Sequence, residues 1–192
     1  MPGDQTDAQV DLLVDFANSY EVDGTEEVGT PAELARWLAD HELLPDGARV
    51  SADDLVLAHD LRAGMRRAMT AHHDRTATED PALTAAAATL PLALAFDRPQ
   101  PRLVPTGSPV ERALGALLVA VEAAETSGAW RRLKLCAAAT CQYAFYDTSK
   151  NQSRTWCSMQ VCGNRQKTRT YRRRQATRTV RTATAQAAAT AR

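Results

Sequence analysis

The sequence predicts an α+β fold, in which a mostly helical N-terminal domain with a small β-hairpin precedes a small C-terminal module. Helix-start signals recur in the first part of the chain, and each is followed by apolar residues at helical spacing. Residues 90–96 instead alternate with a period of two, and together with residues 102–104 after a proline-containing turn they are typical of a hairpin. All four cysteines lie within 27 residues near the C-terminal end, so that this segment is a separate module.

The helices of the N-terminal domain, residues 8–130, are predicted from capping residues and apolar spacing. Residues 8–18 carry apolar side chains at helical spacing, so the first helix is expected there. Four further starts follow, at Thr30 with Pro31 and Glu33, Ser51 with Asp54, Asp80 with Pro81, and Ser108 with Pro109 and Glu111. The helix after Ser51 is expected to place Leu57, Leu61, Met65 and Met69 in the core. Gly128 is expected to end the last helix.

The sheet element and the two ends of the chain complete this organisation. Residues 90–96 alternate at three leucines, and residues 102–104 follow a proline-containing turn, so a hairpin is expected. Residues 1–7 are polar and acidic, are unlike a signal peptide, and are expected to be disordered. Residues 176–192 consist mainly of Ala, Thr and Arg without an apolar stripe, and a frayed helix or disorder is expected.

The formal net charge of zero conceals two oppositely charged halves. Residues 1–130 hold 22 acidic and 9 basic residues, whereas residues 131–192 hold 14 basic residues and one acid, Asp147. An acidic domain joined to a basic module is typical of proteins that bind nucleic acid. No apolar run approaches about 18 residues, so no membrane contact is expected and the predicted location is cytoplasmic, with the nucleoid.

The cysteine spacing, C-x4-C-x15-C-x4-C, predicts one structural zinc ion per chain. Its ligands would be the four thiolates of Cys136, Cys141, Cys157 and Cys162. Residues five apart on a regular α-helix do not share a face, so each four-residue loop between paired cysteines must be partly non-helical. Such a closed site has no open position for a substrate, and no catalytic residue or enzymatic activity is predicted.

Basic residues dominate the segment that follows the last cysteine and predict a helix that binds phosphate groups. A solvated helix usually contains acidic residues that pair with its basic ones, and this segment has none. Its composition therefore favours phosphate binding over a solvated tail. Gly163 is expected to permit a tight turn off the ligand, and Asn164 to bond locally to the backbone. The candidate nucleic-acid contacts are Arg154, Arg165, Lys167, Arg169, Arg172, Arg173 and Arg174.

Several other residues allow two interpretations. The aromatic residues Tyr143, Phe145, Tyr146 and Trp156 could stack on bases, but a small apolar cluster over the zinc site is favoured. Asp147 is expected to cap a turn rather than to assist catalysis. His72 and His73 are expected at an exposed helix end rather than as metal ligands.

Residues 136–165 closely resemble the CGNR zinc finger family, whose name is the tetrad Cys162 to Arg165. Matching positions include Phe145, Asp147 and Ser149, Ser153-Arg154, and Trp156 to Met159. In that family the module usually follows a domain named ABATE, a stress-induced transcription regulator, and residues 8–130 resemble it through their opening Asp11 to Asn18. The resemblance implies a mixed α and β fold, with the zinc finger and its basic helix in residues 131–175.

The function expected from these observations is that of a DNA-binding transcription regulator. The zinc finger and basic helix would contact DNA, while the N-terminal domain senses a small-molecule effector or forms a homodimer. Two alternatives stay open, an RNA-binding accessory protein and a zinc-stabilised module that binds another protein.

Overall fold

The computed structural model describes residues 2–22, 24–74, 79–169, 172 and 175, and it confirms the α+β class. The predicted tail, residues 176–192, lies outside the described part of the chain. The helical body consists of α1 (Pro2–Asn18), α2 (Pro31–Asp40), α3 (Ala52–Ala71), α4 (Pro81–Ala88) and α5 (Pro109–Thr126). Within the described ranges, no helix is both long and apolar enough to cross a membrane.

The helices begin where the capping residues predict. The side chains of Thr30, Ser51, Asp80 and Ser108 each accept a hydrogen bond from the backbone N–H three residues further on. At Ser51 and Ser108 the capping box is complete, because the carboxylate at the third helical position also accepts from the backbone N–H of the serine. At Thr30 the reciprocal bond differs, since the threonine hydroxyl itself donates to Glu33 Oε2 at 2.9 Å.

The first helix is longer than predicted. It begins at Pro2, so residues 2–7, which were expected to be disordered, are helical in the structure. Proline suits the first helical position, because it has no N–H to satisfy there and its φ angle is already helical. The start of α1 could not be predicted from apolar spacing, because its buried apolar residues begin only at Val10.

The main hydrophobic core lies where α3 meets α1, α2 and α4, and where α1 packs along α5. Leu61, Met65 and Met69 of α3 are almost completely buried, which confirms that this stripe faces the core, and Leu57 is partly buried at its edge. Phe16 of α1 packs against Trp37 of α2 with ring centroids 5.3 Å apart.

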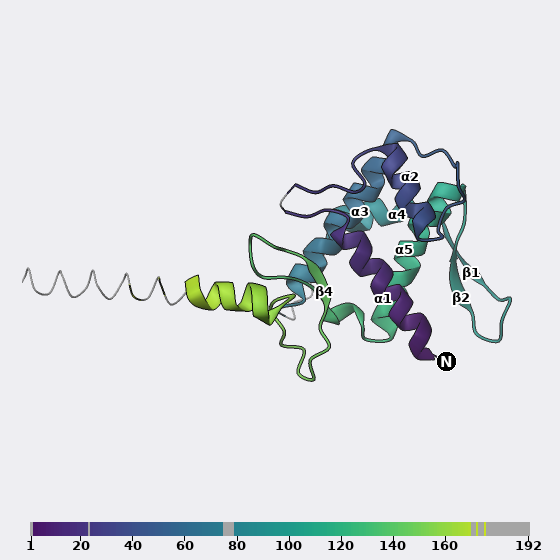
Figure 1. Cartoon of the computed structure of the whole chain (residues 1–192). Coiled ribbons are helices and arrows are strands. Elements are labelled where there is room, and N and C mark those ends of the chain that lie inside the picture. The colour runs from purple at the N-terminus through teal and green to yellow at the C-terminus, as the bar shows by residue number, and fades with distance from the viewer. Residues whose placement is uncertain (1, 23, 75–78, 170–171, 173–174, 176–192) are drawn as a thin grey trace, which may run out of the picture.

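The hairpin is also confirmed. Strands β1 (Leu92–Ala95) and β2 (Arg102–Pro105) pair antiparallel, with Leu92 opposite Pro105 and Ala95 opposite Arg102. The base of the hairpin packs on α5, and its tip extends beyond the helices (Figure 1).

A second small sheet joins the cysteine segment to the helical body. A 3-10 turn (Trp130–Arg132) leads into β3 (Leu133–Leu135), which pairs antiparallel with β4 (Ala144–Tyr146). Strand β3 packs against α3 and β4 packs against α1. Leu133, Leu135 and Ala144 are buried in the main core, so the core continues past residue 130 into the segment that carries the cysteines.

Candidate metal centre and basic helix

The four cysteine sulfurs form one compact group, in which all Sγ atoms lie within 4.8 Å of one another. Cys141 and Cys157 have their Sγ atoms 3.6 Å apart, and those of Cys157 and Cys162 are 3.8 Å apart. A tetrahedral ion with Zn–S bonds of about 2.3 Å requires neighbouring sulfurs to lie about 3.8 Å apart. Thiolate sulfur is also a preferred zinc ligand, so this donor set fits one zinc ion.

The first cysteine pair is held by a tight turn directly after β3. The backbone N–H of Cys136 donates to Tyr143 O at 2.8 Å, which continues the strand pairing as far as the first sulfur. The N–H of Cys141 then returns to Ala138 O at 2.8 Å. Gln142 has a φ of +49°, the left-handed conformation that turns the chain into β4. The non-helical loop predicted between Cys136 and Cys141 is therefore present.

Cys162 lies on a single π-helical turn, Met159–Gly163, which runs directly into an α-helix at Asn164, and Cys157 precedes this turn by two residues. The defining bond of the turn joins the N–H of Gly163 to Ser158 O, five residues earlier, at 3.0 Å. Ser158, between Cys157 and the turn, has an extended backbone (φ −141°, ψ 126°), so the segment between the two cysteines is only partly helical. The Sγ atoms of Cys157 and Cys162 lie 3.8 Å apart and can face one ion, and the partly non-helical loop predicted here is confirmed.

Gly163 has a role different from the one predicted. It is not among the glycines with positive φ, so no special backbone conformation requires it. A Cβ atom at this position would instead lie 3.0 Å from Sδ and 3.1 Å from Cε of Met159. Glycine therefore leaves room for the Met159 side chain to fold back over the π-turn. The local bond predicted for Asn164 is present, since Nδ2 donates to Gln160 O at 3.1 Å.

The sulfur group does not ionise evenly. Burial and neighbouring thiols raise the pKa values of Cys157 and Cys162. Burial also opposes ionisation of Cys136, but hydrogen bonds from the backbone N–H groups of Cys157 and Ala138 lower its pKa overall. Four thiolates this close together repel one another, and a divalent cation relieves that repulsion because it neutralises half of the negative charge.

The aromatic residues divide between two apolar clusters. Phe145 is buried beside the sulfurs together with the partly buried Trp156, which confirms the cluster over the zinc site for these two residues. Tyr146 packs against the main core instead, and Tyr143 is exposed. Arg154 belongs to the first cluster, because its guanidinium lies 4.9 Å from the Phe145 ring centroid and donates to the carbonyls of Trp156 and Cys157.

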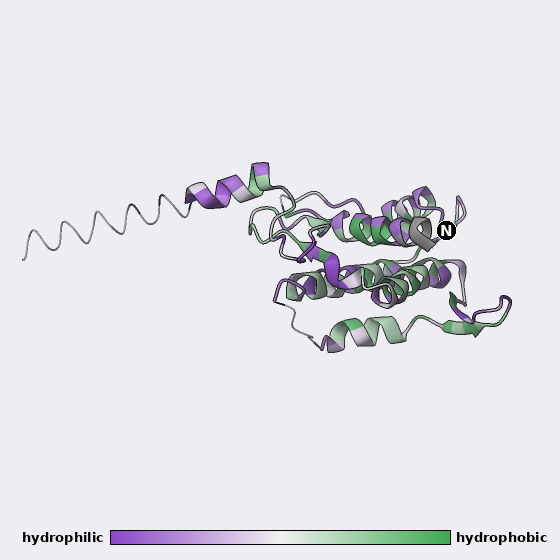
Figure 2. Ribbon diagram, turned by 90° about the horizontal axis from the view of Figure 1, so that it is seen from below, coloured by the Kyte–Doolittle hydropathy of each residue, from purple (hydrophilic) through white to green (hydrophobic). Residues whose placement is uncertain are grey.

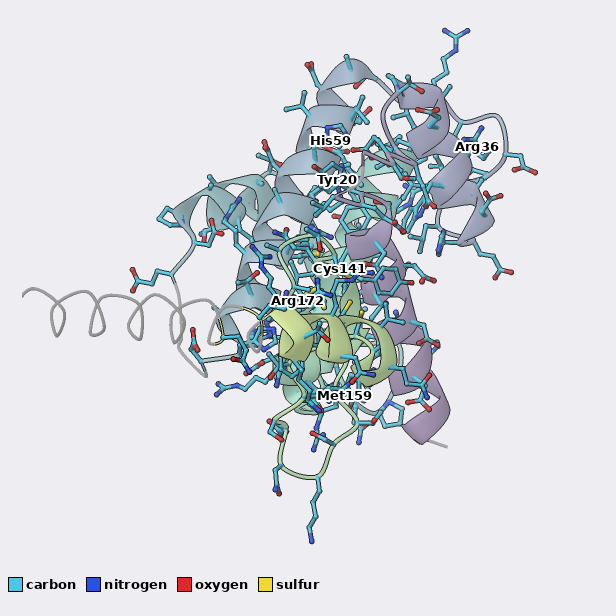
Figure 3. The ribbon with its side chains drawn as sticks, turned by 60° about the vertical axis from the view of Figure 1, so that its left-hand side comes forward. Tyr20, Arg36, His59, Cys141, Met159 and Arg172 are labelled. Atoms are coloured by element: carbon cyan, nitrogen blue, oxygen red, sulfur yellow. The ribbon has the colours of Figure 1, made fainter. Side chains whose placement is uncertain are left out.

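The helix that begins at Asn164 carries the other candidate cations. Arg165, Lys167, Arg169 and Arg172 are all exposed on it, and in the described part of the chain none of them has an ion-pair partner. Figure 2 shows this helix as strongly hydrophilic and directed away from the body, and Figure 3 shows Cys141 in the module and Arg172 on the helix. Arg173 and Arg174 lie outside the described residues. The structure therefore groups four candidate cations together and places Arg154 elsewhere.

The expectation that His72 and His73 occupy an exposed helix end is wrong. His72 Nδ1 lies 2.7 Å from Leu133 O, and His73 Nε2 lies 2.5 Å from Leu135 O, so both rings are bonded to β3. The side chains are partly buried because β3 packs across the end of α3. A cleft of about 590 Å³ remains beside this contact, with His73, Lys134 and Arg154 among its lining residues.

Two family models match the chain. One, the ABATE model, carries the description "Putative stress-induced transcription regulator" and covers residues 11–139, more than half of the sequence. The chain belongs to the ABATE family. The second model, the CGNR zinc finger, covers residues 132–175. The two matches overlap over residues 132–139, which include β3 and Cys136, and neither description is that of an enzyme. No curated protein matches the chain.

This ABATE protein uses Asn18, at the end of the motif that resembles the start of the family domain, to attach the cysteine module. The N–H of Ala144 donates to Asn18 Oδ1 at 2.7 Å, and Asn18 Nδ2 donates to Ala144 O at 3.1 Å. Arg66 of α3 adds a second link, because it donates to Gln142 O in the first cysteine turn at 3.1 Å. The motif pointed to Asn18, but no local sequence signal pointed to the contact partner 126 residues away.

Asp147 caps a turn, as predicted, because its Oδ1 accepts from the N–H of Ser149 at 2.9 Å. The sequence did not predict that this carboxylate is fully buried in the ABATE protein and paired with Lys134. One sequence feature could have indicated this ion pair: Asp147 is the only acidic residue among 62 residues that include 14 basic ones.

Proposed function

We propose that this ABATE protein is a transcription regulator that binds DNA through its zinc finger and the helix that follows. Zinc would be held by Cys136, Cys141, Cys157 and Cys162 as a structural ion. The observation that carries the proposal is the row of four exposed cations on a helix that begins two residues after the ligand Cys162, for which the described residues provide no ion-pair partner. The family description supports the regulatory role, and the charge pattern supports DNA as the partner.

The zinc ion would contribute rigidity. It would tie Cys157 and Cys162 to the first cysteine pair, so that the helix starts from a fixed turn rather than from a free chain. Like charges one helical turn apart repel one another and destabilise an isolated helix. Phosphate groups remove this repulsion, so DNA binding is expected to stabilise the helix.

The cations on the helix have different roles in this proposal. Arg165 and Arg169 are four residues apart, share one face and lie nearest the anchored end, so they are the best placed to contact base edges, where arginine pairs with guanine. Lys167 and Arg172 would contact phosphate groups, which position the protein without reading sequence. Arg154 is assigned a structural role instead, because its guanidinium is already bonded within the module.

The direct test is a binding competition with the intact, zinc-loaded chain and a labelled duplex of mixed sequence at low salt. We expect the duplex to bind and unlabelled duplex DNA to compete better than single-stranded RNA of equal length. Preferential competition by RNA would favour the RNA-binding alternative. Absence of any salt-sensitive binding to either nucleic acid would contradict the proposal and favour a protein-binding module.

A further inference from the structure

The β1–β2 hairpin exposes a large apolar surface that the zinc finger does not explain. Leu92, Leu94 and Phe96 are 37%, 54% and 74% exposed. The base of the hairpin packs on α5, because a Cβ atom at Gly115 would lie 2.8 Å from Pro105 Cβ and 3.4 Å from Leu92 Cδ2. Leu94 and Phe96, further toward the tip, are the more exposed apolar residues of this strand. The hairpin stands on the side of the molecule opposite the basic helix (Figures 1 and 2). An isolated two-stranded hairpin is only marginally stable, and an exposed apolar face is typical of an interaction site, so we expect this face to bind a partner.

The two edges of the hairpin differ in their capacity to accept another strand. The N–H of Thr106 donates to Pro91 O at 2.9 Å, so the backbone groups of residues 91, 93 and 95 point toward β2. By alternation, those of Leu92, Leu94 and Phe96 point outward from β1. The outward positions of β2 include Pro105, which has no N–H, so that edge is protected. Strand β1 therefore presents the open edge.

The sequence of this open edge is complementary to itself. Residues 92–96 are Leu-Ala-Leu-Ala-Phe, so the order of large and small residues is the same in both directions about Leu94. Antiparallel pairing of this segment with its own copy would place Leu94 opposite Leu94, each Ala93 opposite Ala95, and each Leu92 opposite Phe96. The backbone groups of Leu92, Leu94 and Phe96, which point outward, would form hydrogen bonds with those of the second copy. Every large side chain would also lie opposite another large side chain.

We propose that β1 pairs antiparallel with β1 of a second copy of this chain, about a two-fold axis through Leu94, to form a continuous four-stranded sheet. Such an interface is isologous and closes on itself, so it yields a dimer rather than a fibre. The inference does not depend on DNA binding, because it rests on the hairpin alone.

Charge also favours this edge as the contact between two copies. Residues 1–130 have an excess of 13 acidic over basic residues, so most approaches of two such domains are repulsive. Residues 82–110 contain one acid, Asp97, and two basic residues, Arg98 and Arg102. Asp97 and Arg102 pair with each other at 2.7 Å. The hairpin therefore carries little net charge and is the region where two acidic domains can meet with least repulsion.

The short hairpin predicts a weak dimer, of the class that buries less than about 1,200 Å² in total. Dissociation constants in the micromolar range are expected, so the protein would be monomeric when dilute and dimeric when concentrated. The basic helices would remain free on the two outer sides of the dimer.

Sedimentation velocity of the full zinc-loaded chain, from about 1 to 200 μM, tests the proposal. The wild type is expected to pass from monomer to dimer, and Leu94→Lys and Leu94→Glu are each expected to stay monomeric, since each places like charges face to face on the axis. A mixture of these two variants should form dimers again. As a control, Val56→Lys on the exposed surface of α3 should dimerise like the wild type. Circular dichroism should be the same for all variants, since Leu94 and Val56 are outside the core.

Three results would overturn the proposal. A wild type that stays monomeric throughout would mean that the apolar face meets a different protein. A dimer that survives Leu94→Lys would place the interface elsewhere. Failure of the Lys and Glu variants to recover a dimer on mixing would exclude the register about Leu94.

Discussion

Lys134 Nζ lies 2.9 Å from Asp147 Oδ2, and both side chains are almost completely buried. Asp147 also accepts hydrogen bonds from Ser149 Oγ at 2.6 Å and from the N–H of Arg154 at 2.9 Å. Lys134 donates in addition to Gln152 O at 2.7 Å. Burial alone would raise the pKa of Asp147, but the bonds from Ser149 and Lys134 outweigh it and lower the pKa to about 2. This ion pair therefore fixes residues 148–154, the loop that leads to the second cysteine pair.

Loss of either partner should loosen the zinc module. Asp147→Ala is expected to cost about 3–5 kcal/mol of stability, because it leaves a buried ammonium group without its counter-charge and removes the acceptor for two backbone N–H groups. Zinc transfer to a chelator should become faster, and urea unfolding with zinc present would measure the stability. Lys150→Met, at an exposed lysine of the same loop, is the matched control and should change neither. Equal effects of the two substitutions would contradict the role given to the pair.

Removal of a cysteine ligand should release the ion without unfolding the body. Cys157→Ser is expected to lose bound zinc and to expose the amides of residues 148–169 to hydrogen exchange, since this region has little core beyond the sulfur cluster. Strands β3 and β4 should stay protected, because Leu133, Leu135 and Ala144 belong to the main core. Elemental analysis and exchange mass spectrometry would follow both changes. Full zinc content in single Cys→Ser variants at two of the four positions would rule out this ligand set.

The contribution of β3 and β4 to the helical body can be measured on fragments. A fragment of residues 1–150 should be more stable than residues 1–130, even without zinc, since it keeps Leu133 and Leu135 in the core. The difference is expected to be on the order of 3 kcal/mol or more. Leu133→Ala together with Leu135→Ala in the longer fragment should remove most of this gain. Two fragments of equal stability would instead support a domain that is complete at residue 130.

Stability should also depend on the protonation of His72. Burial lowers the pKa of His72, and the bond to Leu133 O only partly opposes this effect. The unfolded chain binds this proton more readily than the folded chain. The stability that comes from burying neutral His72 is therefore fully present above the ordinary pKa of about 6.5, and it is lost as the pH falls through that value. Unfolding free energies between about pH 7.5 and 6 should decrease more in the wild type than in His72→Asn. Parallel pH profiles would mean that His72 does not titrate differently on folding.

The elements that could be predicted from sequence are those whose causes are local. Ser51, Asp80 and Ser108 cap helices through bonds to residues three positions away, so both partners are visible in one short window. The period-two alternation of the hairpin is local in the same sense. The cysteine group could be predicted because the paired spacing of the four cysteines is itself typical of a metal site.

The features that sequence reasoning missed depend on tertiary packing. Nothing near Lys134 shows that this cation is buried, because its partner becomes a neighbour only when β3 pairs with β4. His72 is partly buried by a strand that begins 61 residues further on. Arg154 was grouped with the helix cations on composition, while its position over the Phe145 ring depends on the fold of the module.

The central claim, that the helix after the zinc finger binds DNA phosphates, is tested most directly by the salt dependence of duplex binding. Affinities would be measured from about 50 to 300 mM salt for the wild type, for Lys167→Gln/Arg172→Gln, and for the control Arg36→Gln/Arg49→Gln, which removes two exposed charges from the helical body. We predict a log–log slope of about −4 to −5 per chain for the wild type and the control, and a slope about 2 units flatter for the helix variant. Identical slopes for the wild type and the helix variant would contradict the claim.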